Sequence, residues 1–397
     1  MSSKSRPKHI LVRSDDRLRS LAELARSTGC IAFDTEFMRE RTYRAKLCLV
    51  QLAAAGDIYI VDPLDEVDLA PVAELIADPE LEVVVHAGRQ DFEIFYERFG
   101  AVPARPFDVQ IAAGFAGLGS SLPYGRLVHA TTGARLAKSE SYTDWCRRPL
   151  TEAQLRYAGD DVRYLLQAAD DVKQRLERHG RMRWALDEMA ELCDASAYEV
   201  DTAEAWRRIP GRGSLSGRQL AVLRELARWR EDAAARRDLP RGWVVKDQSL
   251  IEIARRSPSD VAALRSIRGL SAKEAERSGK HILEAVRRGR EAPPIDIPRG
   301  PGRPAQIRAR ATAGLADALL RARCEEAGVA PELVATRADL ESLLTALFAD
   351  GSAPPGHRLL QGWRRELFGD DLVSLAQGRV ALRAVEGSPY IEEVPLG

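Results

Sequence analysis

The sequence predicts an α/β half followed by a mainly helical half. In residues 1–204, short apolar runs alternate with amphipathic segments, a pattern typical of a sheet flanked by helices. Beyond residue 205, apolar residues recur at helical spacing and strand-like runs almost vanish. The length of 397 residues also exceeds the roughly 100 to 200 residues of one domain. We therefore expect an α/β domain together with separate all-α modules.

Strands are expected where short, β-branched apolar runs are bounded by polar or turn residues. They are HILVR at 9–13, CIAFDTEF at 30–37, LCLVQLAA at 47–54, DIYIVD at 57–62 and EVVVHA at 82–87. Only Ala55 and Gly56 separate the third run from the fourth, which predicts an antiparallel hairpin. The sheet is therefore expected to be mixed.

Helices are expected where apolar residues lie three or four apart. In the first half they cover 15–27, 68–76, 89–99, 109–116 and 151–177, and a longer stretch runs from 182 to about 198. The stretch 291–306 holds five prolines in sixteen residues, a composition typical of a linker. These patterns divide the chain into an α/β domain at 1–204, a helical module at 205–292, a linker at 293–306 and a second helical module at 307–397.

The charge of the chain is balanced overall but unevenly distributed. Lys and Arg total 59, as do Asp and Glu, yet residues 205–310 hold 25 basic and 12 acidic residues, a net charge of +13. A basic segment beside an acidic remainder indicates one part that binds a polyanion and another that concentrates carboxylates. A solvated arginine-rich surface explains the same count. Trp229 and Trp243 lie in this segment, where tryptophans either pack in the core or stack on bases.

The chain lacks the patterns of membrane and secreted proteins. No window approaches the roughly 18 apolar residues of a membrane span, and the N-terminal residues lack the apolar region of a signal peptide. The five cysteines are scattered and never form a CxxC pair, so we expect ordinary buried thiols rather than a disulfide framework or a zinc knuckle. A cytoplasmic location is expected, and no heptad pattern requires a partner chain, so we expect a monomer.

Two carboxylates in the segment IAFDTEF give the sharpest local signal. Asp34 and Glu36 lie two apart on an expected buried strand, so both project toward the same face. Two charges about 7 Å apart on a buried strand repel each other unless cations compensate them. Acid-x-acid triplets are common by chance among 59 acidic residues, so the apolar strand around this one provides the information. The context favours a divalent metal site over a solvent-facing pair.

Two further motifs contribute acidic residues. In TEAQLRYAGDDVRYLL, Tyr157 and Asp161 lie four apart and share one face of a helix, whereas Asp160 points elsewhere. In HAGRQDFEIF, Asp91 falls in the first turns of the helix that follows a strand ending at His86. We expect His86 to satisfy backbone groups at the strand end rather than to bind a metal.

Together these motifs form an oxygen-only ligand set without a histidine cluster. The set consists of Asp34, Glu36, Asp91 and Asp161, with Tyr157 beside the last. Carboxylate oxygens favour Mg²⁺ or Mn²⁺ over zinc. Two such ions about 4 Å apart are widely used for displacement at a phosphodiester.

The three motifs resemble those of a known enzyme family. FDTEF, HAGRQDFEIF and YAGDDVRYLL look like the three exonuclease motifs of the DEDD 3′-to-5′ exonucleases, in their tyrosine-containing subgroup. KSESYTDWCRRPLTEAQLRYA at 138–158 resembles the stretch ahead of the third motif in the ribonuclease D family. Residues 215–290 are similar to an HRDC domain, and the residues after 306 look like a second, more divergent copy. The resemblance implies an RNase H-like exonuclease domain with a mixed, mainly parallel sheet flanked by helices, followed by two small helical HRDC-like domains.

The resemblance also implies roles for individual residues. It assigns Asp34, Glu36, Asp91 and Asp161 as ligands of two divalent ions, Mg²⁺ or Mn²⁺, and Tyr157 as a catalytic residue that orients the attacking water. A sister subgroup carries a histidine five positions before the last aspartate, where this chain has Arg156, so that version is excluded. Asp108 also recurs in the family pattern, and we expect it to cap a helix or to support the site.

The implied activity is hydrolysis of RNA from its 3′ end with release of nucleoside 5′-monophosphates. The expected substrates are structured RNAs, tRNA precursors in particular, and the basic HRDC-like module is expected to bind RNA. A DNA-directed exonuclease stays open as an alternative because the metal chemistry is indifferent to the sugar, which only recognition of the 2′-hydroxyl distinguishes. An inert nucleic-acid-binding scaffold is the alternative outside enzymes.

Overall fold

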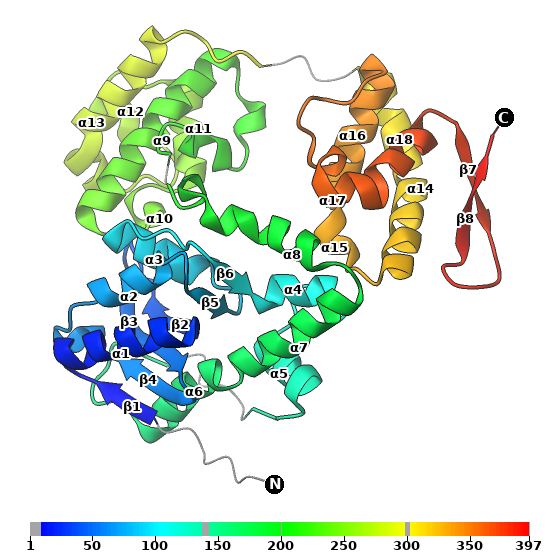
Figure 1. Ribbon diagram of the computed structural model, residues 1–397. Coiled ribbons are helices and arrows are strands. Elements are labelled where there is room, and N and C mark those ends of the chain that lie inside the picture. Colours follow the sequence, from blue (N-terminus) through cyan, green and yellow to red (C-terminus); the bar gives the residue numbers. More distant parts are fainter. Residues whose placement is uncertain (1–8, 137–142, 200, 298–301, 397) are drawn as a thin grey trace.

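A six-stranded mixed sheet forms the core of the N-terminal half (Figure 1). The computed structural model describes residues 9–136, 143–199, 201–297 and 302–396. The sheet has the order β1-β4-β3-β2-β5-β6. Its strands are β1 (His9–Val12), β2 (Cys30–Met38), β3 (Lys46–Ala54), β4 (Asp57–Val61), β5 (Glu82–Val85) and β6 (Pro106–Asp108). Pairs β1·β4, β2·β5 and β5·β6 are parallel, while β2, β3 and β4 form an antiparallel meander. The expected hairpin is confirmed, with Ala54 opposite Asp57.

Eight α-helices accompany the sheet in the described part of this half (Figure 1). They are α1 (Asp15–Thr28), α2 (Ala70–Ile76), α3 (Arg89–Phe99), α4 (Val109–Phe115), α5 (Tyr124–Thr132), α6 (Glu152–Arg163), α7 (Leu165–Arg178) and α8 (Met182–Met189). The short strand β6 and helix α5 are additions to the sequence-based prediction.

Two helix predictions were wrong in extent. The single helix expected at 151–177 is broken at Tyr164 into α6 and α7, because α6 packs on β2, β3 and β4 whereas α7 packs on α4 and α5. The apolar period continues across the break, so the sequence carries no signal for it. The stretch expected to be helical from 182 to about 198 ends at Met189 and continues as short 3₁₀ turns.

The two faces of β2 carry different side chains. Phe33 is fully buried, and its ring lies 6.1 Å from that of Phe92 and 5.4 Å from that of Phe95, both on α3. Asp34 and Glu36 alternate with Phe33 and therefore project to the opposite face, over which α6 packs. The alternation thus anchors the strand through aromatic residues and leaves its carboxylates facing α6.

A helical module with its own apolar core follows the sheet domain. It consists of α9 (Gly217–Arg237), α10 (Arg241–Val244), α11 (Asp247–Arg256), α12 (Val261–Arg265) and α13 (Ala272–Glu291). Its buried residues form a cluster separate from that of the sheet domain. Trp229 belongs to this cluster, whereas Trp243 on α10 is 62% exposed. The module contacts the sheet domain through Tyr43, whose hydroxyl donates to Glu231 over 2.9 Å.

The C-terminal module repeats part of this arrangement. It consists of α14 (Arg303–Ala327), α15 (Pro331–Val334), α16 (Arg337–Asp350), α17 (Gly362–Arg364), a π-helical turn (Arg365–Gly369), α18 (Asp370–Ala376) and the antiparallel strands β7 (Val380–Ala384) and β8 (Ile391–Pro395). Three helices of this module correspond to three of the first module at a constant offset of 90 residues. Helix α14 ends 90 residues after α9, α15 lies 90 residues after α10, and α16 starts 90 residues after α11. The hairpin β7–β8 departs from the all-helical prediction for this part. The linker expected at 293–306 ends earlier than predicted, because residues 303–306 form the first turn of α14, where a proline is tolerated. Residues 298–301 of this stretch lie outside the described residues.

The C-terminal module shares one continuous apolar core with the sheet domain. Leu333 on α15 lies so close to Gly114 on α4 that a Cβ at Gly114 would come within 2.4 Å of it. Trp363 packs its ring edge-on to Phe115, with centroids 4.9 Å apart. Figure 1 shows this module over α4 and α8, and the first helical module over α3. In the described residues, no helix is both long and apolar enough to cross a bilayer.

Candidate active site

Three of the predicted carboxylates meet at one point between β2 and α6. One oxygen from each of Asp34, Glu36 and Asp161 lies within 4.8 Å of the others. Asp34 and Glu36 reach the point from the same face of β2, and Asp161 reaches it from α6, which packs on that face. All three side chains are partly buried. The structure therefore brings together residues that are separated by more than 120 positions in the sequence.

Asp91 lies beside this cluster rather than within it. It is 6% exposed in the first turn of α3, and its Oδ1 accepts a hydrogen bond from the Thr35 hydroxyl. Thr35 stands between the two ligand positions of β2 and points to the opposite face, toward α3. Asp91 still acts on Asp34, because its charge contributes to the raised pKa of that residue. Thr35 was not singled out from the sequence, although its position inside FDTEF was the available signal.

The loop that leads to Asp91 is held by Asp108. The Asp108 carboxylate accepts from the backbone N–H groups of Ala87, Gly88 and Gln110 over 3.0, 3.1 and 2.9 Å. It therefore caps α4 and also fixes the turn before α3, which agrees with the role expected for it. A side chain at Gly88 would meet Val85 at 2.5 Å, so the turn requires glycine. His86 contacts the Leu122 carbonyl oxygen over 2.9 Å, which confirms its expected role toward the backbone.

Tyr157 lies on α6 one turn before Asp161. Its ring lies 5.8 Å from that of Trp145. Burial raises the pKa of Tyr157 above its ordinary value, and the charges of Asp161, Glu36 and Asp34 raise it further. A tyrosine with a raised pKa keeps its proton at neutral pH, so its hydroxyl can donate a hydrogen bond.

The cluster brings three acidic side chains together without a basic partner in the described chain. Burial raises the pKa of Glu36 to about 8 and that of Asp161 to about 8, and burial together with Asp91 raises the pKa of Asp34 well above its usual range. No Lys or Arg among the described residues forms an ion pair with these three carboxylates. Hard divalent cations fit such a set, because they bind carboxylate oxygens and remove the repulsion.

Asp160 and Arg156 both lie on α6 outside the cluster. Asp160 pairs with Arg163 over 3.0 Å, which agrees with the expectation that it points elsewhere. Its charge nevertheless contributes to the raised pKa of Asp161. Arg156, at the position of the histidine in the sister subgroup, is 66% exposed and lies 3.8 Å from Glu152.

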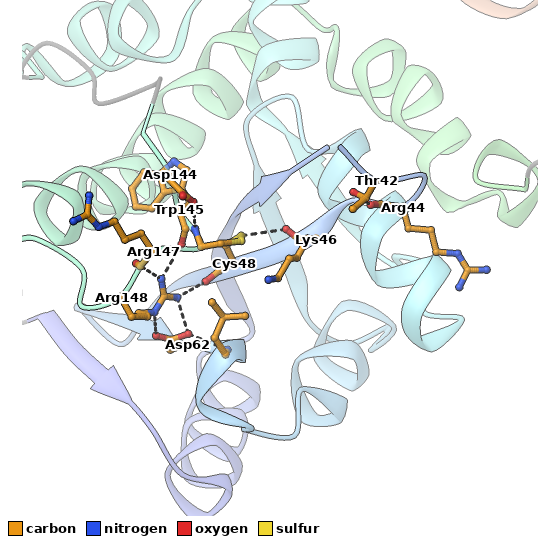
Figure 2. The surroundings of a disulfide bond; sticks show 11 residues. Thr42, Arg44, Lys46, Cys48, Asp62, Asp144, Trp145, Arg147 and Arg148 are labelled. Atoms are coloured by element: carbon orange, nitrogen blue, oxygen red, sulfur yellow. Dashed lines mark hydrogen bonds and ion pairs between the residues drawn. A yellow bond between two sulfur atoms is a disulfide. The ribbon is translucent and has the colours of Figure 1, made fainter. Parts of the chain in front are cut away.

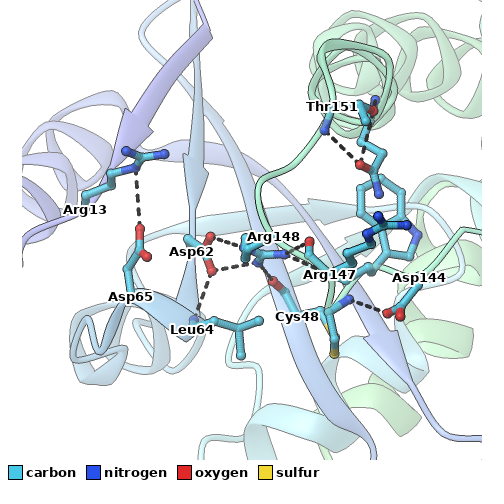
Figure 3. Close-up of polar contacts among 12 residues, drawn as sticks. Arg13, Cys48, Asp62, Leu64, Asp65, Asp144, Arg147, Arg148 and Thr151 are labelled. Atoms are coloured by element: carbon cyan, nitrogen blue, oxygen red, sulfur yellow. Dashed lines mark hydrogen bonds and ion pairs between the residues drawn. A yellow bond between two sulfur atoms is a disulfide. The ribbon is translucent and has the colours of Figure 1, made fainter.

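The segment before α6 is tied to the sheet by an arginine that the sequence did not reveal (Figure 2). Arg148 Nη2 donates to the Cys48 carbonyl and to Asp62 Oδ1, both over 2.7 Å, and its Nη1 donates to the Trp145 carbonyl over 2.8 Å. Figure 3 shows the same contacts with Thr151, which begins α6 through a capping box with Gln154. This network fixes the start of the helix that carries Tyr157 and Asp161. Residues 138–142 of the family-like segment lie outside the described residues.

The expectation of five unpaired, buried cysteines was wrong. Cys48 on β3 and Cys146 in the segment before α6 form a disulfide, with Cα atoms 5.2 Å apart. The two residues are 98 positions apart, and only the folded arrangement of β3 and this segment brings them together. The remaining thiols also differ in burial, since Cys324 is buried but Cys193 is exposed.

Comparisons with known proteins agree on the class of enzyme. Residues 10–177 match a family model described as 3′-5′ exonuclease, and residues 219–286 match the HRDC domain. The chain is similar to ribonuclease D of Gluconacetobacter diazotrophicus, with 43% identity over 98% of each chain. It is similar to ribonuclease D of Granulibacter bethesdensis, with 41% identity over 96% of this chain and 97% of the relative. A crystal structure of Escherichia coli RNase D, described as an exoribonuclease involved in structured RNA processing, has a TM-score of 0.81 and 35% identity, covering 94% of this chain and 99% of that one.

Proposed function

Because this chain belongs to the ribonuclease D family of 3′-to-5′ exoribonucleases, we propose that the cluster between β2 and α6 is its catalytic metal site. Three carboxylate oxygens within 4.8 Å of one another, without an ion-pair partner in the described chain, carry this proposal. Exonucleases of this family depend on divalent metal ions. We assign the 3′ ends of structured RNAs, including tRNA precursors, as the substrates, and a monomer in the cytoplasm as the working form.

The protein residues hold and orient the reacting groups. Asp34, Glu36 and Asp161 would hold two hard cations, Mg²⁺ or Mn²⁺. Asp91 completes the acidic set from α3, where it accepts the Thr35 hydroxyl and adds negative charge near Asp34. When bound, two such ions supply the Lewis acidity that activates water and stabilises the departing 3′-oxygen. Tyr157 donates a hydrogen bond that orients the attacking water, because its raised pKa keeps the hydroxyl protonated.

The activity assay that tests this proposal compares RNA with DNA. With Mg²⁺ present, 3′-labelled RNA is expected to release labelled nucleoside 5′-monophosphate, and the matching DNA is expected to release it at least about tenfold more slowly if the site reads the 2′-hydroxyl. Equal rates would favour a DNA-directed exonuclease. Binding of both without any release would favour an inert scaffold.

We also propose that the chain divides at 1–204, 205–292 and 307–397, with the second and third parts as two HRDC-like domains. The 90-residue offset between α9–α11 and α14–α16 supports two copies of one arrangement. The copies use corresponding positions differently. Leu333, the counterpart of Trp243, packs on the sheet domain, whereas Trp243 is exposed. We assign the exposed surface of the first copy to RNA binding.

The surroundings of Trp243 favour a polyanion. The residue before Trp243, Gly242, lines a cavity of about 290 Å³ together with Arg208, Arg230, Arg241, Lys246, Glu231 and Asp247. The two acids are paired, Asp247 with Arg230 over 2.6 Å and Glu231 with Arg241 over 2.8 Å. Arg208 and Lys246 form no ion pair with any described residue. The cavity therefore keeps two positive charges without an ion pair in the described chain, and the exposed Trp243 directly follows its lining residue Gly242.

Replacing Trp243 with Ala is expected to weaken binding of single-stranded RNA by about 5- to 100-fold, the loss of one base stacked on an aromatic ring. The slope of log Kd against log salt is expected to stay the same, because stacking releases no counterions. Lys246→Ala should instead reduce that slope by about one. Fluorescence anisotropy at several salt concentrations measures both. Leu186→Ala, which removes another exposed apolar side chain, serves as the control. Unchanged affinity in Trp243→Ala would place RNA elsewhere.

A further inference from the structure

Gln51 on β3 is a buried polar residue without a partner. Its side chain is 0% exposed, and neither its Nε2 nor its Oε1 forms a hydrogen bond with any described residue. A buried amide normally binds both its donor and its acceptor groups, because leaving water without a new partner is unfavourable. An orphaned amide in a folded protein therefore indicates a partner that arrives with a ligand or moves on binding.

The register of the sheet identifies that partner. Gln51 lies directly opposite Asp34 on β2 and opposite Ile60 on β4, so the three side chains share one face of the sheet. Along its own strand, the positions on that face are Leu49 and Ala53. Asp34 is therefore the only one of these four nearest neighbours with polar side-chain atoms.

Asp34 in turn has no side-chain hydrogen-bond donor among the described residues. The backbone N–H of Thr35 bonds its carboxylate, whereas the charges of Asp91, Asp161 and Glu36 raise the pKa of Asp34. The ion-pair partners that fix many buried carboxylates are absent from the described surroundings of this cluster. On β3, the Gln51 amide is thus a donor without an acceptor, and opposite it on β2 the Asp34 carboxylate is an acceptor without a side-chain donor.

We propose that Gln51 is a positioning residue for Asp34, and that its Nε2–H donates to the Asp34 carboxylate when the site holds its cations. This inference rests on the proposed function, since it gives Gln51 a part in preparing the metal site. A hydrogen bond to the oxygen that faces β3 orients the other oxygen toward Glu36 and Asp161. Partners of this kind commonly change metal affinity by 10- to 100-fold.

Metal affinity without RNA tests the proposal. In Gln51→Met, an apolar side chain of similar length replaces the amide, so the metal-free protein is expected to melt at the same or a higher temperature. Its dissociation constant for Mn²⁺, measured from free Mn²⁺ by electron paramagnetic resonance, is expected to rise by at least about tenfold. Competition with Mg²⁺ should give the same ratio. An unchanged dissociation constant in a folded Gln51→Met protein would overturn the proposal.

A second buried glutamine provides the matched control. Gln154 is also buried, but its amide is satisfied in the capping box of α6. Gln154→Met weakens only the first turn of α6, so it is expected to lower the melting temperature and to change Mn²⁺ affinity by far less than the tenfold expected for Gln51→Met. If Gln51→Met does not fold, Gln51→Leu replaces it in the same titration. Failure of the wild-type protein to bind Mn²⁺ would refute the metal site itself, whereas equal binding by wild type and variant would refute only the role of Gln51.

Discussion

Replacing Asp34 with Asn is expected to reduce the rate of 3′-nucleotide release by about 10³-fold or more. The change removes one of the three carboxylates that we propose as ligands of the catalytic metal ions. RNA binding should persist, since the basic module has a separate core and does not include this residue. Multiple-turnover hydrolysis of labelled RNA measures the first effect, and anisotropy with the same RNA measures the second. Near-normal hydrolysis by a folded Asp34→Asn protein would exclude the metal site proposed here.

The same substitution is expected to stabilise the metal-free protein at neutral and higher pH. Burial and neighbouring carboxylates raise the pKa of Asp34 in the folded state, so its ionised form opposes folding. A raised carboxyl pKa means that the folded state binds more protons, and stability therefore falls as pH rises above the ordinary carboxyl pKa near 4. The advantage of Asp34→Asn should be largest near pH 8 and should vanish near pH 4. Denaturant unfolding in a chelator at both values measures it, and added Mg²⁺ should reverse the order of the two proteins.

The residues proposed as catalytic could be predicted from the sequence because each signal was local. The alternation of Phe33, Asp34 and Glu36 predicts which side chains share a face of β2, and a four-residue spacing places Tyr157 and Asp161 on one face of a helix. The strand and the helix were both predicted, so the face on which each of these side chains lies could be predicted as well. The meeting of the motifs did not follow from spacing and rested on resemblance to a family.

Features that depend on contacts across the fold were missed. The bond from Thr35 to Asp91, the bridge between Cys48 and Cys146, and the Arg148 network each join segments that only the sheet order brings together. The break between α6 and α7 has the same origin, because each helix follows a different neighbour while the apolar period continues. Such features are set by tertiary packing, which single-sequence periodicity does not encode.

The C-terminal module packs on the sheet domain, so a truncation is a poor test of RNA binding by the first helical module. Removing residues 205–397 eliminates the basic module, but it also strips the C-terminal module from α4 and α8 and exposes the apolar surface around Phe115. Loss of activity in that fragment would combine lost RNA contacts with a damaged core. Point substitutions at Trp243 and Lys246 separate the two effects.

Replacing Trp363 with Ala is expected to destabilise the whole chain by about 3–5 kcal/mol, the usual cost of truncating a buried tryptophan. Trp363 is 3% exposed and lies between Phe115 and Trp184, with ring centroids 4.9 and 5.8 Å away. The neighbouring Arg364 binds Glu188 on α8 over 2.6 Å, so loss of the tryptophan also loosens an ion pair between the modules. Urea unfolding followed by circular dichroism measures the change.

Trp243→Ala is the matched control for this measurement, because it removes the same side chain from an exposed position and should cost within about 0.5 kcal/mol. The two tryptophans then separate the two uses of the helical modules. Trp363→Ala should lower stability and leave the salt slope of RNA binding intact, whereas Trp243→Ala should weaken RNA binding at constant stability. A Trp363→Ala protein as stable as the wild type would show that the C-terminal module does not share the core of the sheet domain in solution.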